Sequence, residues 1–361
     1  MNTNKKTLTL LIHTNVAFEW CKSIVAQLNR QVIKRGFSLN IVYRYEDIVS
    51  SGGPVILLGV DRLWITENLR RLEESGHKVI LLSGVVEKIS SNISRIIVDH
   101  DDLIQKNVSH LRQCGRTKLA FFGGQKNDTS DNNKAESFSK LFSSGHIYNI
   151  TENIEECFCR LSGHLYEYDG IICANDIIAV YLLKRCKELG ISVPGQLSIV
   201  GNGNLWITAN TTPSITTVSV DVSKIVAVTL NICKSFYQYE EIASVDVYMK
   251  SFMIPRASTG YANFEADSTQ YMKAPRLIYE SSNTDKELIA IQQIDRIMSS
   301  LSPDKLQLLE RYLKGETYDS IASQMYVSEE TLRYHIKKIY KALGVHSKKE
   351  CTLLLKQYLG G

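Results

Sequence analysis

Residues 301–361 read LSPDKLQLLERYLKGETYDSIASQMYVSEETLRYHIKKIYKALGVHSKKECTLLLKQYLGG. Apolar residues recur at three- and four-residue steps in this stretch, and the spacing predicts four short amphipathic helices. Ser302 is suited to begin the first helix, and Gly315 stands where that helix would end. A second helix is predicted at 318–325, and Ser328 begins a third. The segment therefore has the pattern of a helix-turn-helix.

The predicted third helix has two faces of different chemistry. One face is an apolar stripe made by Leu332, Ile336, Ile339 and Leu343. The other repeats a cation at every fourth residue, with Lys338 beside the repeat of Arg333, Lys337 and Lys341. A cationic helix face of this kind suits the acidic backbone of double-stranded DNA. The alternative is a small helical bundle whose basic face contacts only solvent.

The charge of the chain is concentrated at the same end. The whole chain carries 42 basic and 38 acidic side chains, a formal charge of +4. From Arg296 onward there are 11 basic and 7 acidic residues, so this stretch accounts for the entire excess. The remaining residues are electrically balanced, and a nucleic-acid partner is therefore expected at the C-terminal end.

Residues 1–260 alternate short β-rich runs with helical patterns, which predicts parallel sheets with helices on both faces. Strands are predicted at 7–13, 39–42, 55–58, 78–82, 96–98, 119–122, 170–173 and 197–200. Helices are predicted between them at 19–35, 67–75, 103–114 and 176–189.

Between these two parts, residues 261–295 are expected to form a linker and a connecting helix, so that the C-terminal domain spans 296–361. The polar residues 261–285 lack clear periodicity. Apolar residues then fall at three- and four-residue steps, at Ile291, Ile294, Met298 and Leu301. This seam either pairs two helices or packs a single helix on its own domain.

Several functional classes lack support in the sequence. No run of 18 apolar residues occurs, and the eight scattered cysteines suit the reducing cytosol, so we expect a cytoplasmic protein without a membrane span. Cys157, Cys159 and His164 lack the paired spacing of a zinc site, and no phosphate-binding loop is found. With no nucleophile-base pattern either, we expect no catalytic residues, no metal and no cofactor.

The C-terminal segment resembles the LuxR/FixJ-type helix-turn-helix over about its whole length. The matching residues are Leu301-Ser302-Pro303, Gly315, Ile321-Ala322, Ser328, Thr331, His335, Ile339 and Leu343-Gly344-Val345. Lys305 stands where the family usually has Glu, so an ion pair within the domain is expected to be missing.

That resemblance implies that the third helix enters the major groove. The family's base-reading positions hold Arg333, Tyr334 and Lys337, and residues suited to phosphate contacts are Ser328, Thr331, Lys338 and Lys341. Arg333 is the candidate for a bidentate guanine contact, worth about 1–3 kcal/mol of discrimination. Tyr334 either contacts a base or packs on the sugar-phosphate edge, and His335 is expected to be structural.

Residues 5–260 carry a second resemblance, to the effector domain of LacI/GalR-type regulators. It rests on Gly170–Asp176, Gly190–Pro194, Leu197–Gly201, Pro213–Val218 and Arg256–Thr259, together with Asp99 and Gly115–Phe121. The implied fold is a two-lobed α/β domain like the periplasmic binding proteins, crossed three times between lobes, followed by the all-α helix-turn-helix domain. Closure of such lobes is a hinge motion.

The second resemblance places candidate ligand contacts at the carboxyl ends of strands. These candidates are Asn15, Phe18, Lys134, Asn175, Asp176, Asn202 and Asn204. Because the family usually has Arg at position 134 and Asp at the position of Gly203, an ordinary sugar is less secure as the ligand. Asp176 is alternatively the cap of the following helix. Stacking on a ligand ring or packing in the core are both open for Trp20, Trp64 and Trp206.

Together the resemblances imply a ligand-responsive transcription regulator, with residues 1–260 sensing a small-molecule effector and 296–361 binding double-stranded DNA. This order reverses the usual one in the sensor's family. We expect a homodimer in which lobe closure repositions two recognition helices. The alternative is a regulator whose sensor binds a protein partner or is switched by phosphorylation, although the first strand lacks the acidic cluster of phosphorylated receivers.

Overall fold

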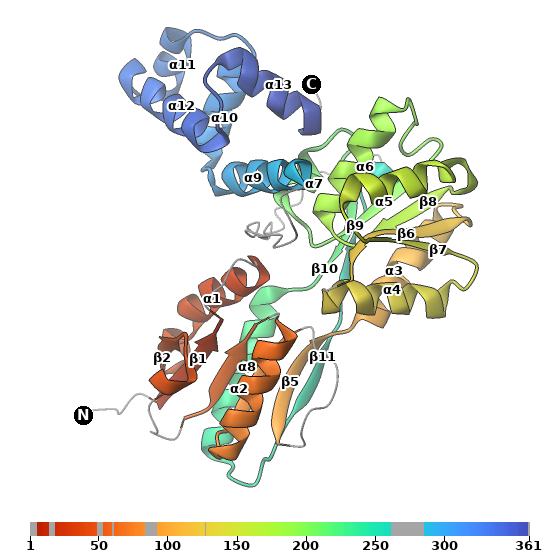
Figure 1. Cartoon of the computed structure of the whole chain (residues 1–361). Helices are drawn as coiled ribbons and strands as arrows, with labels where there is room; N and C mark the ends of the chain where they lie inside the picture. Colours follow the sequence, from red (N-terminus) through yellow and green to blue (C-terminus); the bar gives the residue numbers. More distant parts are fainter. Residues whose placement is uncertain are drawn as a thin grey trace.

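The computed structural model describes residues 6–13, 19–48, 53–59, 61–83, 92–126, 128–260 and 285–359. Within these residues the chain forms two lobes, each built on a six-stranded sheet, and a separate group of C-terminal helices. Figure 1 shows the two lobes one above the other, with the C-terminal helices on the side of the second lobe. The predicted fold class is confirmed.

Lobe 1 has strand order β11-β5-β4-β3-β1-β2, and every pair in it is parallel. Side chains alternate between the faces, so Leu10 packs with α1 and α8 while Leu11 packs with α2. The strands are β1 (Lys6–Ile12), β2 (Phe37–Val42), β3 (Val55–Leu58), β4 (Val79–Leu82), β5 (Ile93–Val98) and β11 (Asp246–Met249). The helices are α1 (Glu19–Gln31), α2 (Arg62–Glu74) and α8 (Val222–Gln238).

Lobe 2 has strand order β12-β10-β9-β8-β6-β7, with only the edge pair β10–β12 antiparallel among its described strands. Phe121 packs with α3 and α4, and Phe122 with α5 and α6. The strands are β6 (Leu119–Gln125), β7 (His146–Ile150), β8 (Gly170–Cys173), β9 (Ser198–Asn202), β10 (Thr216–Ser219) and β12 (Phe252–Ile254). The helices are α3 (His100–Gln113), α4 (Thr129–Leu141), α5 (Ile154–Ser162), α6 (Asp176–Glu188) and α7 (Trp206–Asn210).

The chain passes between the lobes three times, after β5, after β10 and after β11. The first and third crossings are bonded to each other. The backbone N–H and hydroxyl of Ser251 donate to Oδ2 of Asp102 at 2.9 and 2.8 Å, and the N–H of Asp99 donates to the Met249 carbonyl at 3.1 Å. These bonds tie the connecting strands to the start of α3.

The C-terminal part consists of a connecting helix α9 (Lys286–Ser300) and four further helices. These are α10 (Pro303–Leu313), α11 (Tyr318–Met325), α12 (Glu329–Leu343) and α13 (Lys348–Leu359). The four helices α10 to α13, without α9, are called the reader domain. Helix α9 runs continuously through residue 296, so the expected domain boundary there falls inside a helix. Most of the expected linker, residues 261–284, lies outside the described part of the chain.

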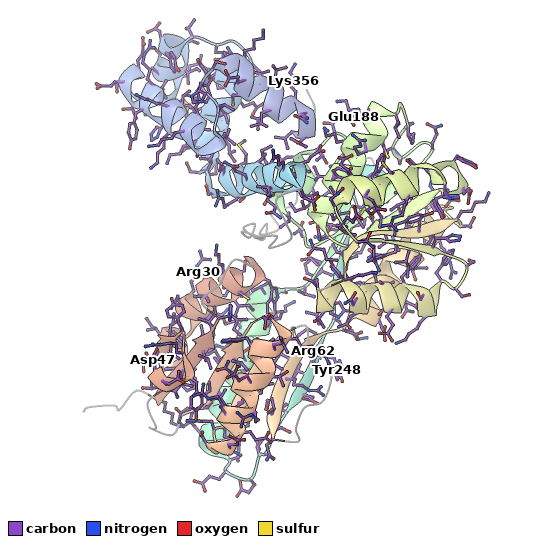
Figure 2. All side chains as sticks on the ribbon, in the orientation of Figure 1. Arg30, Asp47, Arg62, Glu188, Tyr248 and Lys356 are labelled. Atoms are coloured by element: carbon purple, nitrogen blue, oxygen red, sulfur yellow. The ribbon has the colours of Figure 1, made fainter. Side chains whose placement is uncertain are left out.

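The elements that sequence reasoning missed have weak apolar patterns. Edge strands β11 and β12 expose Asp246, Tyr248 and Phe252, so no continuous apolar run marks them. Figure 2 shows Tyr248 at the outer edge of lobe 1. Helix α4 is rich in Ser, Asn and Asp, which favour caps and turns over helix interiors. Strands β7 and β10 and helices α5, α7 and α8 were also not predicted.

Some predicted bounds were wrong for a local reason. The helix predicted at 19–35 ends at Gln31 and is followed by a 3₁₀ turn, Ile33–Arg35, because helix ends often tighten in this way. Helix α2 starts before the predicted residue 67, since Oδ1 of Asp61 accepts the Trp64 N–H at 2.7 Å and caps the helix earlier. Among the described residues no helix is long and apolar enough to cross a membrane.

Candidate functional site

Helix α12 presents the basic face that the sequence predicted. The hydroxyl of Ser328 accepts the Thr331 N–H at 3.1 Å and caps the helix, and Gly344 ends it with φ 70°. The apolar stripe is buried: Leu332, Ile336, Ile339 and Leu343. The predicted DNA contacts all lie on exposed side chains of this helix or its cap: Ser328, Thr331, Arg333, Tyr334, Lys337, Lys338 and Lys341.

Two adjacent aromatic side chains of α12 differ in their exposure. The Tyr334 side chain is 60% exposed, so it is available to a partner. His335 is half-buried, and burial together with the nearby charges of Lys305 and Lys338 lowers its pKa. A neutral, partly packed imidazole fits the structural role expected for His335.

The turn before α12 holds a residue that sequence reasoning missed. Tyr326 adopts the left-handed conformation with φ 56°, which non-glycine residues rarely use, and its side chain is 94% exposed. Tyr326 ends α11 in place of the glycine or asparagine that would signal such a turn. An exposed aromatic side chain therefore stands next to the N-terminus of the basic helix.

Helix α9 joins the reader domain to lobe 2 through one continuous apolar core. Its Leu288, Ile291 and Ile294 are buried in the same cluster as Ile178 of lobe 2 and Ile336 of α12. Figure 1 shows α9 lying between α7 and the reader domain. In the described part of the chain, the apolar residues of α9 therefore pack against other residues of the same chain. This agrees with the interpretation of α9 as a single packed helix, and not with the pairing of two such helices.

Specific polar bonds fix this junction. Oδ1 of the fully buried Asp295 accepts the Ile207 N–H of α7 at 2.7 Å. On the other side of α9, the side chain of Gln293 donates to the Ala342 carbonyl of α12 at 2.9 Å. A single helix therefore contacts both lobe 2 and the last turn of the basic helix.

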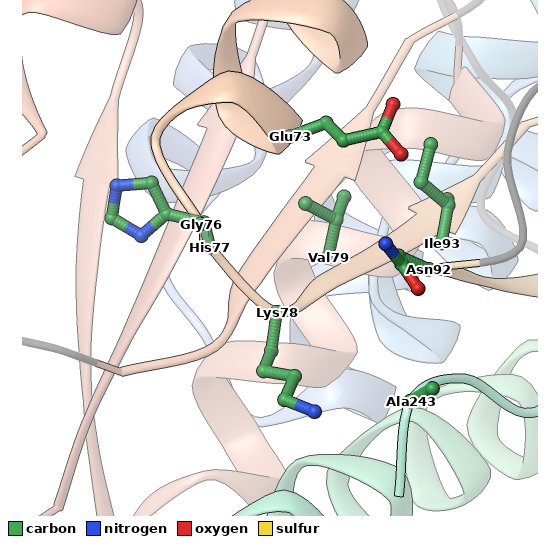
Figure 3. A pocket seen from close by; sticks show the side chains of 8 residues that line it. All are labelled: Glu73, Gly76, His77, Lys78, Val79, Asn92, Ile93 and Ala243. Atoms are coloured by element: carbon green, nitrogen blue, oxygen red, sulfur yellow. The ribbon is translucent and has the colours of Figure 1, made fainter.

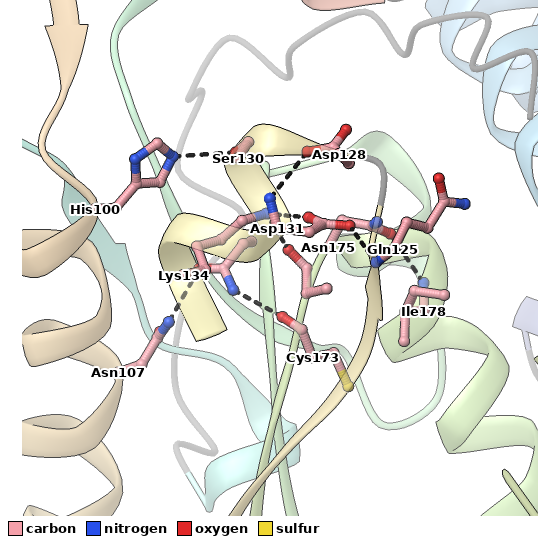
Figure 4. A network of polar contacts seen from close by, with 12 residues as sticks. His100, Asn107, Gln125, Asp128, Ser130, Asp131, Lys134, Cys173, Asn175 and Ile178 are labelled. Atoms are coloured by element: carbon pink, nitrogen blue, oxygen red, sulfur yellow. Dashed lines mark hydrogen bonds and ion pairs between the residues drawn. The ribbon is translucent and has the colours of Figure 1, made fainter. Parts of the chain in front are cut away.

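The candidate ligand residues gather at the carboxyl ends of β6, β8 and β9, but they bond to other side chains and to backbone groups of lobe 2. The Lys134 ammonium donates to Oδ1 of Asp131 at 2.7 Å and to the Ala174 carbonyl at 2.6 Å, and it is buried (Figure 4). Its charge is thereby paired with a carboxylate within lobe 2.

Asn175, and not Asp176, caps helix α6, because Oδ1 of Asn175 accepts the Ile178 N–H at 3.1 Å. The cap interpretation of Asp176 was therefore wrong. Asp176 is fully buried and accepts the Leu205 N–H and the Thr217 hydroxyl, each at 2.7 Å. Burial raises its pKa to about 6. This carboxylate anchors the chain entering α7.

The two asparagines after β8 and β9 are also engaged. Asn202 donates to the Cys173 carbonyl at 2.8 Å and accepts from Asn107 at 3.0 Å, and Oδ1 of Asn204 accepts from Arg256 at 2.7 Å. Gly203 has φ 138°, and a Cβ there would lie 3.3 Å from Oδ2 of Asp176. The glycine that replaces the family's aspartate thus suits both the backbone and the anchoring carboxylate.

Asn15 and Phe18 lie outside the described residues. The three tryptophans pack in apolar cores, with Trp206 buried in lobe 2 and Trp20 and Trp64 partly buried in lobe 1. Of the candidate ligand residues in the described part of the chain, Asn175 is the only one that is not buried.

Three polar atoms in this network remain available. His100 Nδ1, Asn107 Oδ1 and Gln125 Nε2 are buried without a hydrogen-bond partner among the described residues. Figure 4 shows all three side chains around Lys134, and His100 contacts Ser130 through Nε2 at 3.0 Å. Buried polar atoms normally have a partner. These three buried atoms therefore have unused hydrogen-bonding capacity.

The buried imidazole makes stability depend on pH. Burial lowers the pKa of His100 to about 4, with Lys134 acting in the same direction and Asp131 and Asp101 opposing it. In the unfolded chain the pKa returns to about 6.5, so between these values protons bind the unfolded state alone. We expect the wild-type chain to lose stability relative to His100→Gln as the pH falls from 6.5 to 4. Urea unfolding at several pH values measures this, and parallel profiles would contradict a buried neutral imidazole.

A pocket of about 240 Å³ lies elsewhere, in lobe 1 (Figure 3). It is lined by residues that precede or begin β4 and β5, including His77, Lys78 and Asn92. This is the amino end of the strands, opposite to the end where ligands bind in open parallel sheets. The described residues contain no group of three metal-ligating side chains.

Comparison with known proteins finds a family match in the two-lobed part of the chain and another in the C-terminal part. The periplasmic binding protein-like domain family matches residues 108–259, and the luxR family of bacterial regulatory proteins matches residues 299–355. An uncharacterised helix-turn-helix transcriptional regulator of Streptomyces limosus is 22% identical over 201 residues, 52% of this chain and 56% of that protein. The chain spans little more than half the length of the first curated relatives it matches.

Solved structures share the fold of the two lobes. The complex of the transcriptional regulator CelR with cellobiose has a TM-score of 0.55 and 15% identity, over 70% of this chain and 84% of that one. The Lac repressor dimer bound to operator and an anti-inducer has a TM-score of 0.56 and 16% identity, over 71% and 82%. The chain thus joins a LacI-like, periplasmic-binding-protein-like domain to a C-terminal LuxR-type helix-turn-helix, as its sequence predicted.

Proposed function

We propose that this protein is a DNA-binding transcription regulator whose reader domain responds to the state of a two-lobed sensor. The observation that carries the proposal is the exposed cationic face of α12, held in place by a buried apolar stripe on the opposite side of the helix. Lys338 and Lys341 are exposed and suited to phosphates, while the equally exposed Arg333, Tyr334 and Lys337 are suited to base edges. The helix-turn-helix match supports this proposal.

A pair of matched charge variants tests it. Lys338→Gln with Lys341→Gln should weaken binding of the full chain to all duplexes alike and reduce the salt dependence by about two counterions. The control is Lys34→Gln with Lys187→Gln, which removes equal charge from exposed positions on the two lobes. Equal binding by both double variants would overturn the assignment of the α12 face.

The ligand is proposed to be a neutral, hydroxyl-rich small molecule held between the lobes. Buried atoms of His100, Asn107 and Gln125 supply donors and acceptors without net charge, and the similarity to a cellobiose-bound regulator supports a carbohydrate. Only a ligand that binds the folded state raises the unfolding midpoint. In a screen of sugars, sugar phosphates and nucleosides, we expect a neutral sugar to raise it, and Gln125→Leu to reduce that rise.

A second candidate keeps the DNA-binding role but replaces the small ligand with a protein partner or a phosphoryl group. The observation in its favour is that Lys134, Asp176, Asn202 and Asn204 all have partners within lobe 2. A screen in which no small molecule moves the midpoint, combined with a shift after treatment with a small phosphoryl donor, would select phosphorylation.

We also propose that the working form is a homodimer, since two copies would place two α12 helices on successive half-sites about one helical turn apart, or a multiple of that. The similar Lac repressor structure is a dimer on its operator. Sedimentation of the full chain with and without a duplex measures the stoichiometry directly.

A further inference from the structure

Arg333 is exposed but its position is fixed. Its side chain is 61% exposed, yet Nη2 lies 3.0 Å from Oε2 of Glu329, one turn earlier on α12. The guanidinium carbon also lies 4.3 Å from the centre of the Tyr318 ring, on the neighbouring helix α11. The carboxylate thus holds one edge of the guanidinium, and the ring lies against the group from a second helix.

The Tyr318 ring is itself supported. It stacks on Tyr312 of α10, with ring centres 4.9 Å apart and planes 29° from parallel. The ammonium of Lys348, at the start of α13, lies 4.8 Å from the centre of the Tyr312 ring. The position of Arg333 therefore depends on side chains from α10, α11 and α13 as well as from its own helix.

Stability alone gives little reason for this arrangement. Exposed ion pairs, and cation–π contacts at exposed sites, each contribute little to folding. What the arrangement does change is the freedom of the guanidinium, because a flexible side chain with many rotamers is restricted to one direction. Bidentate contact with a base edge requires a defined guanidinium plane.

We propose that Tyr318 is a positioning residue for Arg333, so that the stacked Tyr312–Tyr318 pair sets the preference for guanine at one base pair of each half-site. The inference rests on the proposed DNA-binding function. Glu329 has a complementary role: it holds the guanidinium while the protein is free and yields Nη2 to the base edge in the complex. Sequence preference therefore depends on a residue outside the recognition helix.

The experiment compares the full chain carrying Tyr318→Leu or Tyr318→Phe with the wild type, by selecting bound duplexes from a pool with randomised positions. The wild type and Tyr318→Phe, which keeps the ring, should enrich guanine at one position about fivefold to a hundredfold. Tyr318→Leu should bring that preference within twofold of random while leaving the salt dependence of binding unchanged.

Two further measurements keep the result interpretable. Far-ultraviolet circular dichroism of each variant shows whether the helices are folded. The variant Glu329→Gln weakens the ion pair but leaves the Tyr318 ring in place, so it should retain at least part of the guanine preference. Equal guanine enrichment by wild type and a folded Tyr318→Leu would overturn the positioning role, as would wild-type selection without guanine. A wild-type chain that captures no duplex would instead overturn the proposed function, and this inference with it.

Discussion

Leu332→Ala is expected to lower the free energy of unfolding of the reader domain by about 2–5 kcal/mol, the cost of leaving a cavity in a well-packed core. Leu332 is 1% exposed and lies in the cluster that unites α9, α12 and α13. Because the apolar stripe holds the basic face in position, duplex binding should fall together with stability. Thermal unfolding followed by circular dichroism and a binding titration at the same temperature measure both effects.

The matched control for this variant is Leu353→Ala on α13. The Leu353 side chain is 60% exposed, so the same chemical change removes little buried surface there. We expect its unfolding midpoint to stay near that of the wild type. Equal losses in the two variants would show that α12 is not anchored by its apolar stripe.

Asp295→Ala is expected to cost about 1.5–3 kcal/mol and to loosen the junction between lobe 2 and the reader domain. The carboxylate is fully buried and accepts the Ile207 N–H, and its removal leaves that donor without this acceptor in an apolar environment. Helix α7 lacks a side-chain cap of its own, since Leu205 stands at its N-cap. Asp295 of α9 therefore accepts a hydrogen bond from the first turn of α7 that a capping side chain of α7 itself would otherwise accept.

Calorimetry of the full chain tests this second prediction. With the wild type, lobe 2 and the reader domain share one core and should unfold in one transition; with Asp295→Ala the reader domain should separate as an earlier transition. The control is Asp304→Ala, which removes an exposed carboxylate from the first turn of α10. A single unchanged transition in Asp295→Ala would contradict the junction described above.

Local signals account for what the sequence predicted well. Ser328 and Gly344 mark the ends of α12 by their own chemistry, and the period of Leu332 to Leu343 determines which face of α12 is buried. Ser302 stands at the start of α10 as predicted, but its side chain makes no capping bond. The alternation of apolar runs with helical patterns likewise predicted parallel sheets covered by helices on both faces. Leu10 and Leu11, which are adjacent in a strand, accordingly pack on opposite faces of the sheet.

Non-local contacts account for what the sequence did not predict. Asn175 and Asp176 are adjacent and both suited to cap a helix, and only the position of Leu205 and Thr217 shows which one does. Lys134 pairs with Asp131 three residues earlier, a spacing visible in the sequence, but its bond to the Ala174 carbonyl depends on the packing of α4 on the sheet. The Tyr318 contact with Arg333 joins two helices and leaves no periodic pattern.

If the basic face of α12 holds duplex DNA, the affinity of the full chain for a duplex must depend on salt concentration, and titrations across a range of salt concentrations measure this. We expect the logarithm of the binding constant to fall steeply with the logarithm of salt concentration, by about 0.9 for each phosphate contacted. We also expect a shallower slope for Lys338→Gln with Lys341→Gln. No detectable binding at low salt, or a slope unaffected by these two changes, would contradict this role of the α12 face.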